Sequence, residues 1–265
     1  MDCKTRSGLR ISVGKNTMTD DEFLAFHAST YDNLVKKLND ARQESSVTRA
    51  IELLLGRLVC AGKSLHVLRK HAPHNSAFDG AMILRGMYDT MLQALYILSD
   101  PAQQELRATQ YLDYYWVEKH KMIDVFDQSQ TNGGQRVSRS TRRASAEPDI
   151  QREFKRVRSA FEYEKGKLRN HWYEGKLNKL AKDVGFLSEY EILHKQLSAA
   201  VHSSSYALRE PLFYENYPMM MFAWKFIFRV LGKFADYNGI ALEKHESDLI
   251  ALSAKNVFGD QSNRL

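Results

Sequence analysis

Cysteine, proline and glycine are all scarce in this chain of 265 residues. Its two cysteines, Cys3 and Cys60, cannot build a disulfide framework or a zinc knuckle, so a cytoplasmic protein in a reducing environment is expected. Five prolines and 14 glycines leave long stretches without a helix breaker. The first residues also lack the apolar run of a signal peptide. These absences argue against a secreted, disulfide-rich protein and favour long helices.

The local motifs of several enzyme classes are also missing from the sequence. There is no glycine-rich loop that could cradle a phosphate, no Gly-x-Ser-x-Gly nucleophile motif and no cysteine-rich site. Asp113, His120 and Asp124 lie near one helix face, but three such residues do not make a metal site. We therefore expect no metal and no other cofactor.

The residues that are abundant predict a folded, basic protein. Hydrophobic residues make up 43% and aromatic residues 11% of the chain, which is enough for a real core. The formal net charge is +6 and the isoelectric point is about 9.1. That charge fits RNA or another anionic partner, and it fits equally well a protein with a solvated, lysine-rich surface.

Apolar residues recur at helical spacing along most of the chain, and no segment alternates as a strand should. Two capping boxes, Thr19 with Glu22 and Ser188 with Glu191, mark expected helix starts. We predict an all-α fold, a single bundle of about seven helices. The expected organisation is a flexible N-terminal arm at 1–18, the bundle at 19–240 and a C-terminal tail at 241–265.

A polar, glycine-bearing and basic segment interrupts the helical pattern between the fourth and fifth expected helices. It predicts a mobile loop at 128–146, between a helix that ends near Phe126 and one that runs from about Pro148 to Arg169. The loop would hold a nucleic-acid backbone electrostatically. The basic residues expected to do so are Arg136, Arg139, Arg142 and Arg143.

The segment PMMMFAWKFIFRVLGKFADY, at 218–237, is apolar enough to raise the question of a membrane span. Lys225, Arg229 and Lys233 are spaced four apart, so they form one polar stripe along an otherwise buried helix. A lone membrane helix would not carry three regularly spaced cations. We therefore interpret the segment as the central helix of a soluble bundle, with no membrane partner.

One candidate site pair lies in the segment ILRGMYDT. Arg85 and Asp89 are four residues apart and share one helix face among apolar neighbours. A buried guanidinium must be paired, and Asp89 is its obvious partner. The pair is either a structural ion pair or an arginine held ready for a phosphate or carboxylate, with Asp89 orienting it.

A histidine-bearing helix face supplies a second candidate. His194, Ser198 and His202 are spaced four and four, so Ser198 could hydrogen-bond His202 and fix its tautomer. We predict that His202 faces Arg85 and Asp89 across the bundle as a general acid or base. The alternative is that His202 only stabilises a helix C-terminus.

Two further groups of residues could take part in a site. Arg69 and His74 lie at a helix-to-helix turn and could bind a phosphate and move a proton; a basic helix end before an exposed turn is the alternative. Trp172 and Tyr111 could stack on a base, although aromatic residues at such positions are more often part of a core.

The order of these motifs resembles a family of bacterial helical proteins of unknown function. That family carries an Arg-x-x-x-acid pair on one helix and a late Ser-x-x-x-His, here Arg85 with Asp89 and Ser198 with His202. The likeness covers about residues 45 to 210, and the usual acid is Glu, one methylene longer than Asp89. The resemblance implies a helical domain and supplies no activity.

The chain is also similar to HEPN domains (higher eukaryotes and prokaryotes nucleotide-binding), in which an Arg-x4-His element would match Arg69 and His74. Many of these are metal-independent ribonucleases of toxin and phage-defence systems and pair as dimers around the active cleft. The resemblance implies RNA cleavage and a homodimer. Pro73 inside the motif and Lys70 after the arginine depart from the usual pattern.

The sequence is compatible with three functions. The first is metal-independent cleavage of RNA, in which a histidine deprotonates the 2′-hydroxyl and an arginine stabilises charge on the phosphate. The second is a non-catalytic module whose Arg85, Asp89 and His202 bind an anionic small molecule or a protein partner. The third is a structural or regulatory protein without a pocket.

Overall fold

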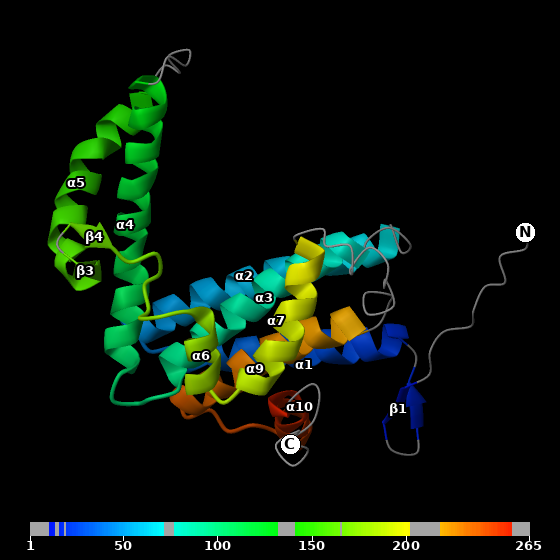
Figure 1. The fold of residues 1–265 in the computed structure, drawn as a ribbon. Helices are drawn as coiled ribbons and strands as arrows, with labels where there is room; N and C mark the ends of the chain where they lie inside the picture. Colours follow the sequence, from blue (N-terminus) through cyan, green and yellow to red (C-terminus); the bar gives the residue numbers. More distant parts are fainter. Residues whose placement is uncertain are drawn as a thin grey trace, which may run out of the picture. The chain divides into compact units, whose positions relative to one another are not determined.

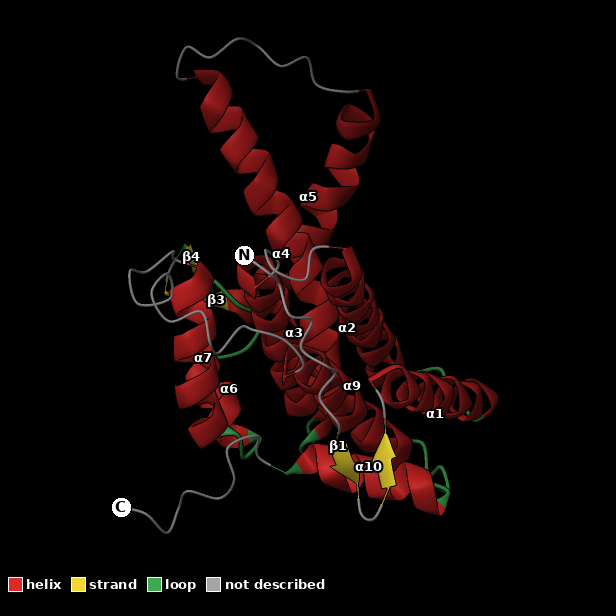
Figure 2. Ribbon diagram, turned by 90° about the vertical axis from the view of Figure 1, so that its right-hand side faces the viewer, coloured by secondary structure: helices red, strands yellow, loops and turns green. Residues whose placement is uncertain are grey.

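A computed structural model of the chain describes residues 11–13, 16–18, 20–71, 77–131, 141–164, 166–201 and 218–255. Figures 1 and 2 show that these residues are almost entirely helical. The helices are α1 (Asp20–Asp40), α2 (Ser46–His71), α3 (Ala77–Leu98), α4 (Gln104–Thr131), α5 (Thr141–Phe161), α6 (Leu177–Asp183), α7 (Leu187–Val201), α9 (Pro218–Tyr237) and α10 (Lys244–Ala254). The strands are β1 (Ile11–Val13), β2 (Asn16–Met18), β3 (Glu162–Glu164) and β4 (Lys167–Leu168).

The predicted all-α class is confirmed, because the strands form only two antiparallel two-stranded pairs in the described ranges. In the first pair, β1 and β2, Ile11 lies opposite Met18, and the second joins β3 and β4. The prediction of about seven helices is wrong, since the described residues contain nine. One of these, α10, lies within 241–265, where the sequence predicted a tail.

Helix α10 begins with a capping box built from two glutamates instead of the usual Ser or Thr with Glu. The Glu243 side chain accepts a hydrogen bond from the backbone at the third helical residue, and the Glu246 carboxylate accepts one from the Glu243 N–H. Lys37 of α1 forms ion pairs with both, with its Nζ 3.1 Å from Glu243 and 2.8 Å from Glu246. The start of α10 is therefore stabilised by a cation that lies 206 residues from Glu243 in the sequence.

The helices on either side of the expected basic loop are longer on that side than the sequence predicted. Helix α4 continues to Thr131 and α5 begins at Thr141, so Arg142 and Arg143 fall in the first turn of α5. Arg136 and Arg139 lie outside the described residues. At its other end α5 stops at Phe161 and not near 169, because β3 and β4 fold back there. Gly166 adopts φ 80° in this turn, and its N–H donates to the Glu162 carboxylate.

The chain divides into two compact units, each built from separate stretches of sequence. Unit 1 comprises Met1–Gln43, Leu54–Met91 and Ser188–Leu265, and unit 2 comprises Glu44–Leu53 and Leu92–Leu187. In unit 1, α9 packs against α1 and α10, and its apolar residues, Phe226, Phe228 and Leu231 among them, are buried. In unit 2, α4 and α5 run side by side, and Val117, Phe154 and Phe161 form part of its core.

A buried ion pair crosses the core of unit 1. Arg229 of α9 donates to both carboxylate oxygens of Glu189 on α7, at 2.6 Å and 2.9 Å. It also donates to the backbone carbonyls of Ser253 and Lys255, at 2.6 Å and 2.8 Å. The side chains of Arg229 and Glu189 are 2% and 0% exposed. The guanidinium thus joins α7, α9 and the end of α10 and is not part of a solvated stripe.

Lys225 and Lys233, the other two cations of the expected stripe, are both more exposed than Arg229. Lys233 is exposed and lies 3.9 Å from Asp236, whereas Lys225 is half-buried. Burial lowers the pKa of Lys225 to about 8, and the neighbouring charge of Arg229 adds to the effect. None of the helices in the described parts of the chain is both long and apolar enough to cross a membrane.

Candidate functional site

Arg85 and Asp89 lie on one face of α3, as their spacing predicts. Arg85 Nε is 4.0 Å from Asp89 Oδ2, and the two side chains are 23% and 30% exposed. At that separation the two groups attract each other without forming a hydrogen bond. Within the described part of the chain, the Arg85 guanidinium donates no hydrogen bond, so its N–H groups are available to a ligand.

The Asp89 carboxyl group lies in a partly apolar surround that favours its protonated form. Burial raises its pKa to about 6, and the positive charges of Arg85 and of Arg57 on α2 oppose that shift. A carboxyl group with a pKa in this range can take up or release a proton near neutral pH. Asp89 is thus suited to acid–base chemistry as well as to orienting Arg85.

Helix α7 brings a second set of polar groups to Arg85 and Asp89. The rings of Tyr190 and His194 stack with centroids 4.5 Å apart, and Ser198 Oγ lies 3.3 Å from His194 Nδ1. Burial lowers the pKa of His194, and the charge of Arg85 lowers it further. Burial also raises the pKa of Tyr190, with Asp89 adding to the rise. The imidazole is therefore held in place and is neutral at pH 7.

These residues define one polar cluster within unit 1, called here the α3–α7 cluster. Its members are Arg57, Arg85, Asp89, Tyr190, His194 and Ser198. The cluster combines a guanidinium with unused donors, a neutral imidazole and a carboxyl group of raised pKa. Such a set can bind an anion and transfer protons to and from it. Groups of three or more potential metal ligands are absent from the described residues.

The predicted site residues are only partly brought together in the described structure. Arg85, Asp89 and Ser198 belong to the α3–α7 cluster, whereas His202 lies outside the described residues, so its facing Arg85 stays a prediction. In the described structure Ser198 bonds His194. Arg69 occupies the last turn of α2, and His74 is likewise outside the described residues.

Trp172 lies in the core of unit 2, and Tyr111 packs against it at a half-buried position. Trp172 is 4% exposed, and its Nε1 donates to Gln93 Oε1 at 2.7 Å. Its ring meets that of Tyr111 edge to face at 5.6 Å and also contacts Tyr96. The indole N–H and much of the ring surface are thus used within the protein.

Sequence reasoning missed three members of the cluster as site residues: Arg57, Tyr190 and His194. The four-residue spacing of His194 and Ser198 identified this helix face, and Tyr190, four residues before His194, extends it. Arg57 gave no local signal, because its relation to Asp89 arises from the packing of α2 beside α3. The prediction from the sequence placed the general acid or base at His202, at the expected end of the helix.

Comparison with known proteins identifies a family for this chain but does not identify an activity. No curated protein and no solved structure matches the chain. A family model described as a family of unknown function (DUF5677) matches residues 50–216. All members of the α3–α7 cluster lie in that range, which also agrees with the extent of the resemblance seen in the sequence. The chain therefore belongs to this family of unknown function.

Proposed function

We propose that the α3–α7 cluster binds a phosphodiester of RNA and cleaves it with the protein's own acid and base groups. The observation that carries this proposal is the guanidinium of Arg85, which has unused donors, lies 4.0 Å from Asp89 and acts electrostatically on His194. An arginine used only for stability would direct its N–H groups to protein acceptors. The net charge of +6 suits a polyanionic substrate such as RNA.

The proposed reaction assigns one role to each charged or titratable group. His194, neutral at pH 7, takes the proton of a ribose 2′-hydroxyl, and the oxygen attacks the adjacent phosphorus. The bond from phosphorus to the 5′-oxygen breaks, and protonated Asp89 gives that oxygen its proton. The products are a 2′,3′-cyclic phosphate and a 5′-hydroxyl. Arg85 and Arg57 stabilise the negative charge that develops on the phosphoryl oxygens.

The direct test is cleavage of a single-stranded RNA labelled with a fluorophore and a quencher, in the presence of EDTA. We expect the RNA to be cut and a DNA of the same sequence to stay intact, because DNA lacks the attacking 2′-hydroxyl. Equal cleavage of both, or activity lost on EDTA treatment, would contradict the proposed chemistry. Binding without cleavage would favour the alternative of a non-catalytic, anion-binding module.

Replacing Arg85 by glutamine should weaken RNA binding by about 10- to 100-fold, the range for losing a hydrogen bond to a charged group. Arg49→Gln is the matched control, since Arg49 is exposed on α2 and the substitution removes the same charge. Binding is measured by fluorescence anisotropy at fixed ionic strength, because salt alone changes such affinities. Equal weakening by both substitutions would show that only net charge matters.

The cleavage rate should pass through a maximum at a pH midway between the pKa of His194 and that of Asp89. The base form of His194 increases as pH rises through its pKa, which lies below 6.5. The acid form of Asp89 decreases as pH rises through about 6. The product of the two fractions therefore falls on both sides. Asp89→Asn should lower the rate and abolish the decline at high pH in single-turnover measurements; an unchanged decline would exclude Asp89 as the acid.

A further inference from the structure

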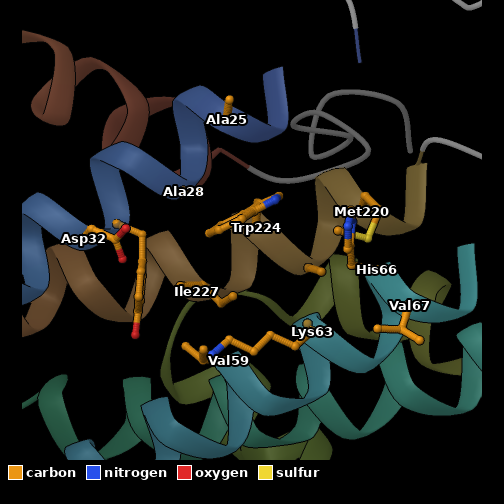
Figure 3. A pocket seen from close by; sticks show the side chains of 13 residues that line it. Ala25, Ala28, Asp32, Val59, Lys63, His66, Val67, Met220, Trp224 and Ile227 are labelled. Carbon is orange, nitrogen blue, oxygen red and sulfur yellow. The ribbon is translucent and has the colours of Figure 1, made fainter. Parts of the chain in front are cut away.

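A cavity of about 700 Å³ lies in unit 1, and no residue of the α3–α7 cluster lines it. Its walls come from α1, α2 and α9, and Figure 3 shows the side chains that line it. From α9 it is lined by Met220, Ala223, Trp224 and Ile227, so that wall is apolar and aromatic. Its size falls within the range of small-molecule sites, about 300–1,000 Å³.

Small residues at the wall keep this space open. Ala25 and Ala28 of α1, Gly62 of α2 and Ala223 of α9 all face it. At Gly62 an added Cβ would meet Ile227 Cδ1 at 3.5 Å and Met87 Cε at 3.7 Å, which are ordinary contact distances. The backbone therefore does not require glycine at this position for steric reasons. Gly62 adds no side chain to the wall of the cavity.

Charged groups are confined to a few positions on the wall. Lys63 and His66 lie one turn apart on α2, and Asp32 comes from α1 (Figure 3). Both Lys63 and His66 are exposed, and neither forms an ion pair with any residue that the structure describes. The lysine is thus a cation at the edge of an apolar space without a protein counter-ion in the described ranges.

We propose that this cavity binds a long-chain monocarboxylate, a free fatty acid. The acyl chain occupies the space between α1 and α9 against Trp224 and Ile227, and its carboxylate pairs with Lys63 beside His66. Burial of methylene groups supplies most of the affinity, and the lysine fixes the orientation. Asp32 repels a second carboxylate, which disfavours a dicarboxylic acid of equal length. This proposal is independent of RNA cleavage and concerns different residues.

Quenching of Trp224 fluorescence by 9,10-dibromostearate tests the proposal, because bromine quenches an indole at short range. We expect saturable quenching in the full-length protein and displacement of the brominated acid by palmitate. Trp224→Phe should abolish the quenching, because neither of the other two tryptophans, Trp116 and Trp172, lines the cavity. Quenching that does not saturate, or that persists fully in Trp224→Phe, would overturn the assignment.

Two pairs of variants locate the acyl chain and the carboxylate. Ala28→Phe fills the cavity from α1 and should abolish quenching, while Ser29→Phe, at the next, exposed position, should not. Lys63→Gln should weaken binding of the acid by about tenfold and leave the matching fatty alcohol unaffected, whereas Lys36→Gln should change neither. Equal effects within either pair would contradict the proposed pose. Quenching by vesicles of brominated phosphatidylcholine as strong as that by the free acid would overturn the choice of ligand.

Discussion

Replacing Glu189 by glutamine is expected to lower the free energy of unfolding by about 3–5 kcal/mol. The substitution keeps the shape of the side chain but removes the charge that neutralises Arg229. Both side chains are almost completely buried, so water cannot replace the lost partner. The carbonyls of Ser253 and Lys255 would remain as the acceptors of an uncompensated guanidinium. Urea denaturation followed by circular dichroism measures the loss.

Glu191→Gln is the matched control for this experiment. Glu191 lies on the same helix two residues further on and is exposed. Because α7 begins at Leu187, Ser188 lies inside the helix and does not form the predicted capping box with Glu191 at its start. Replacing Glu191 should therefore change stability by less than about 0.5 kcal/mol. The double variant Glu189→Leu with Arg229→Met should recover most of the loss, because an apolar pair of similar volume needs no charge compensation. If Glu189→Gln unfolds at the same urea concentration as Glu191→Gln, the buried pair does not stabilise unit 1.

Replacing His194 by glutamine should reduce RNA cleavage by about 10²–10⁴-fold, the range for loss of a general base. Glutamine can still pack beside Tyr190 and meet Ser198, so folding should be retained. RNA affinity should change little, because Arg85 and Arg57 remain. Single-turnover cleavage and anisotropy on the same RNA separate the two effects.

His171→Gln is the control for His194, since His171 is an exposed histidine of unit 2 and lies outside the cluster. The same cleavage and anisotropy measurements on His202→Gln and His74→Gln test the two histidines that were predicted from the sequence to transfer a proton. A loss confined to His202→Gln would move the base from His194 to the position first predicted. A loss confined to His74→Gln would favour the Arg69 and His74 pair of the HEPN resemblance.

The helical class and most helix positions could be predicted from the sequence, because the apolar period repeats strongly in each segment. Helix α10 was missed for a physical reason. Its capping box uses Glu243, which is not among the usual N-cap residues, and its charge is balanced by Lys37 of α1. The end of α5 was misplaced because the turn at Gly166 follows a segment that also suits a helix.

The candidate site was predictable only where its groups lie on one helix. Arg85 with Asp89 followed directly from the four-residue spacing. The partner of Arg229 could not be predicted in this way, because Glu189 lies 40 residues earlier in the sequence, on a different helix. A cation in an apolar helix is compatible with a solvated stripe or with a buried pair, and only tertiary packing decides between them.

The division of the chain into interleaved units has a consequence for its synthesis on the ribosome. Unit 2 uses Glu44–Leu53 and Leu92–Leu187, so all its segments have been translated before α7 emerges. In unit 1, Arg229 binds both Glu189 and the carbonyl of Lys255. The core of unit 1 therefore cannot form completely until Lys255 has left the exit tunnel of the ribosome. Nascent chains should therefore acquire protease resistance in unit 2 first, and α1 stays unpaired with α9 until α9 has been translated.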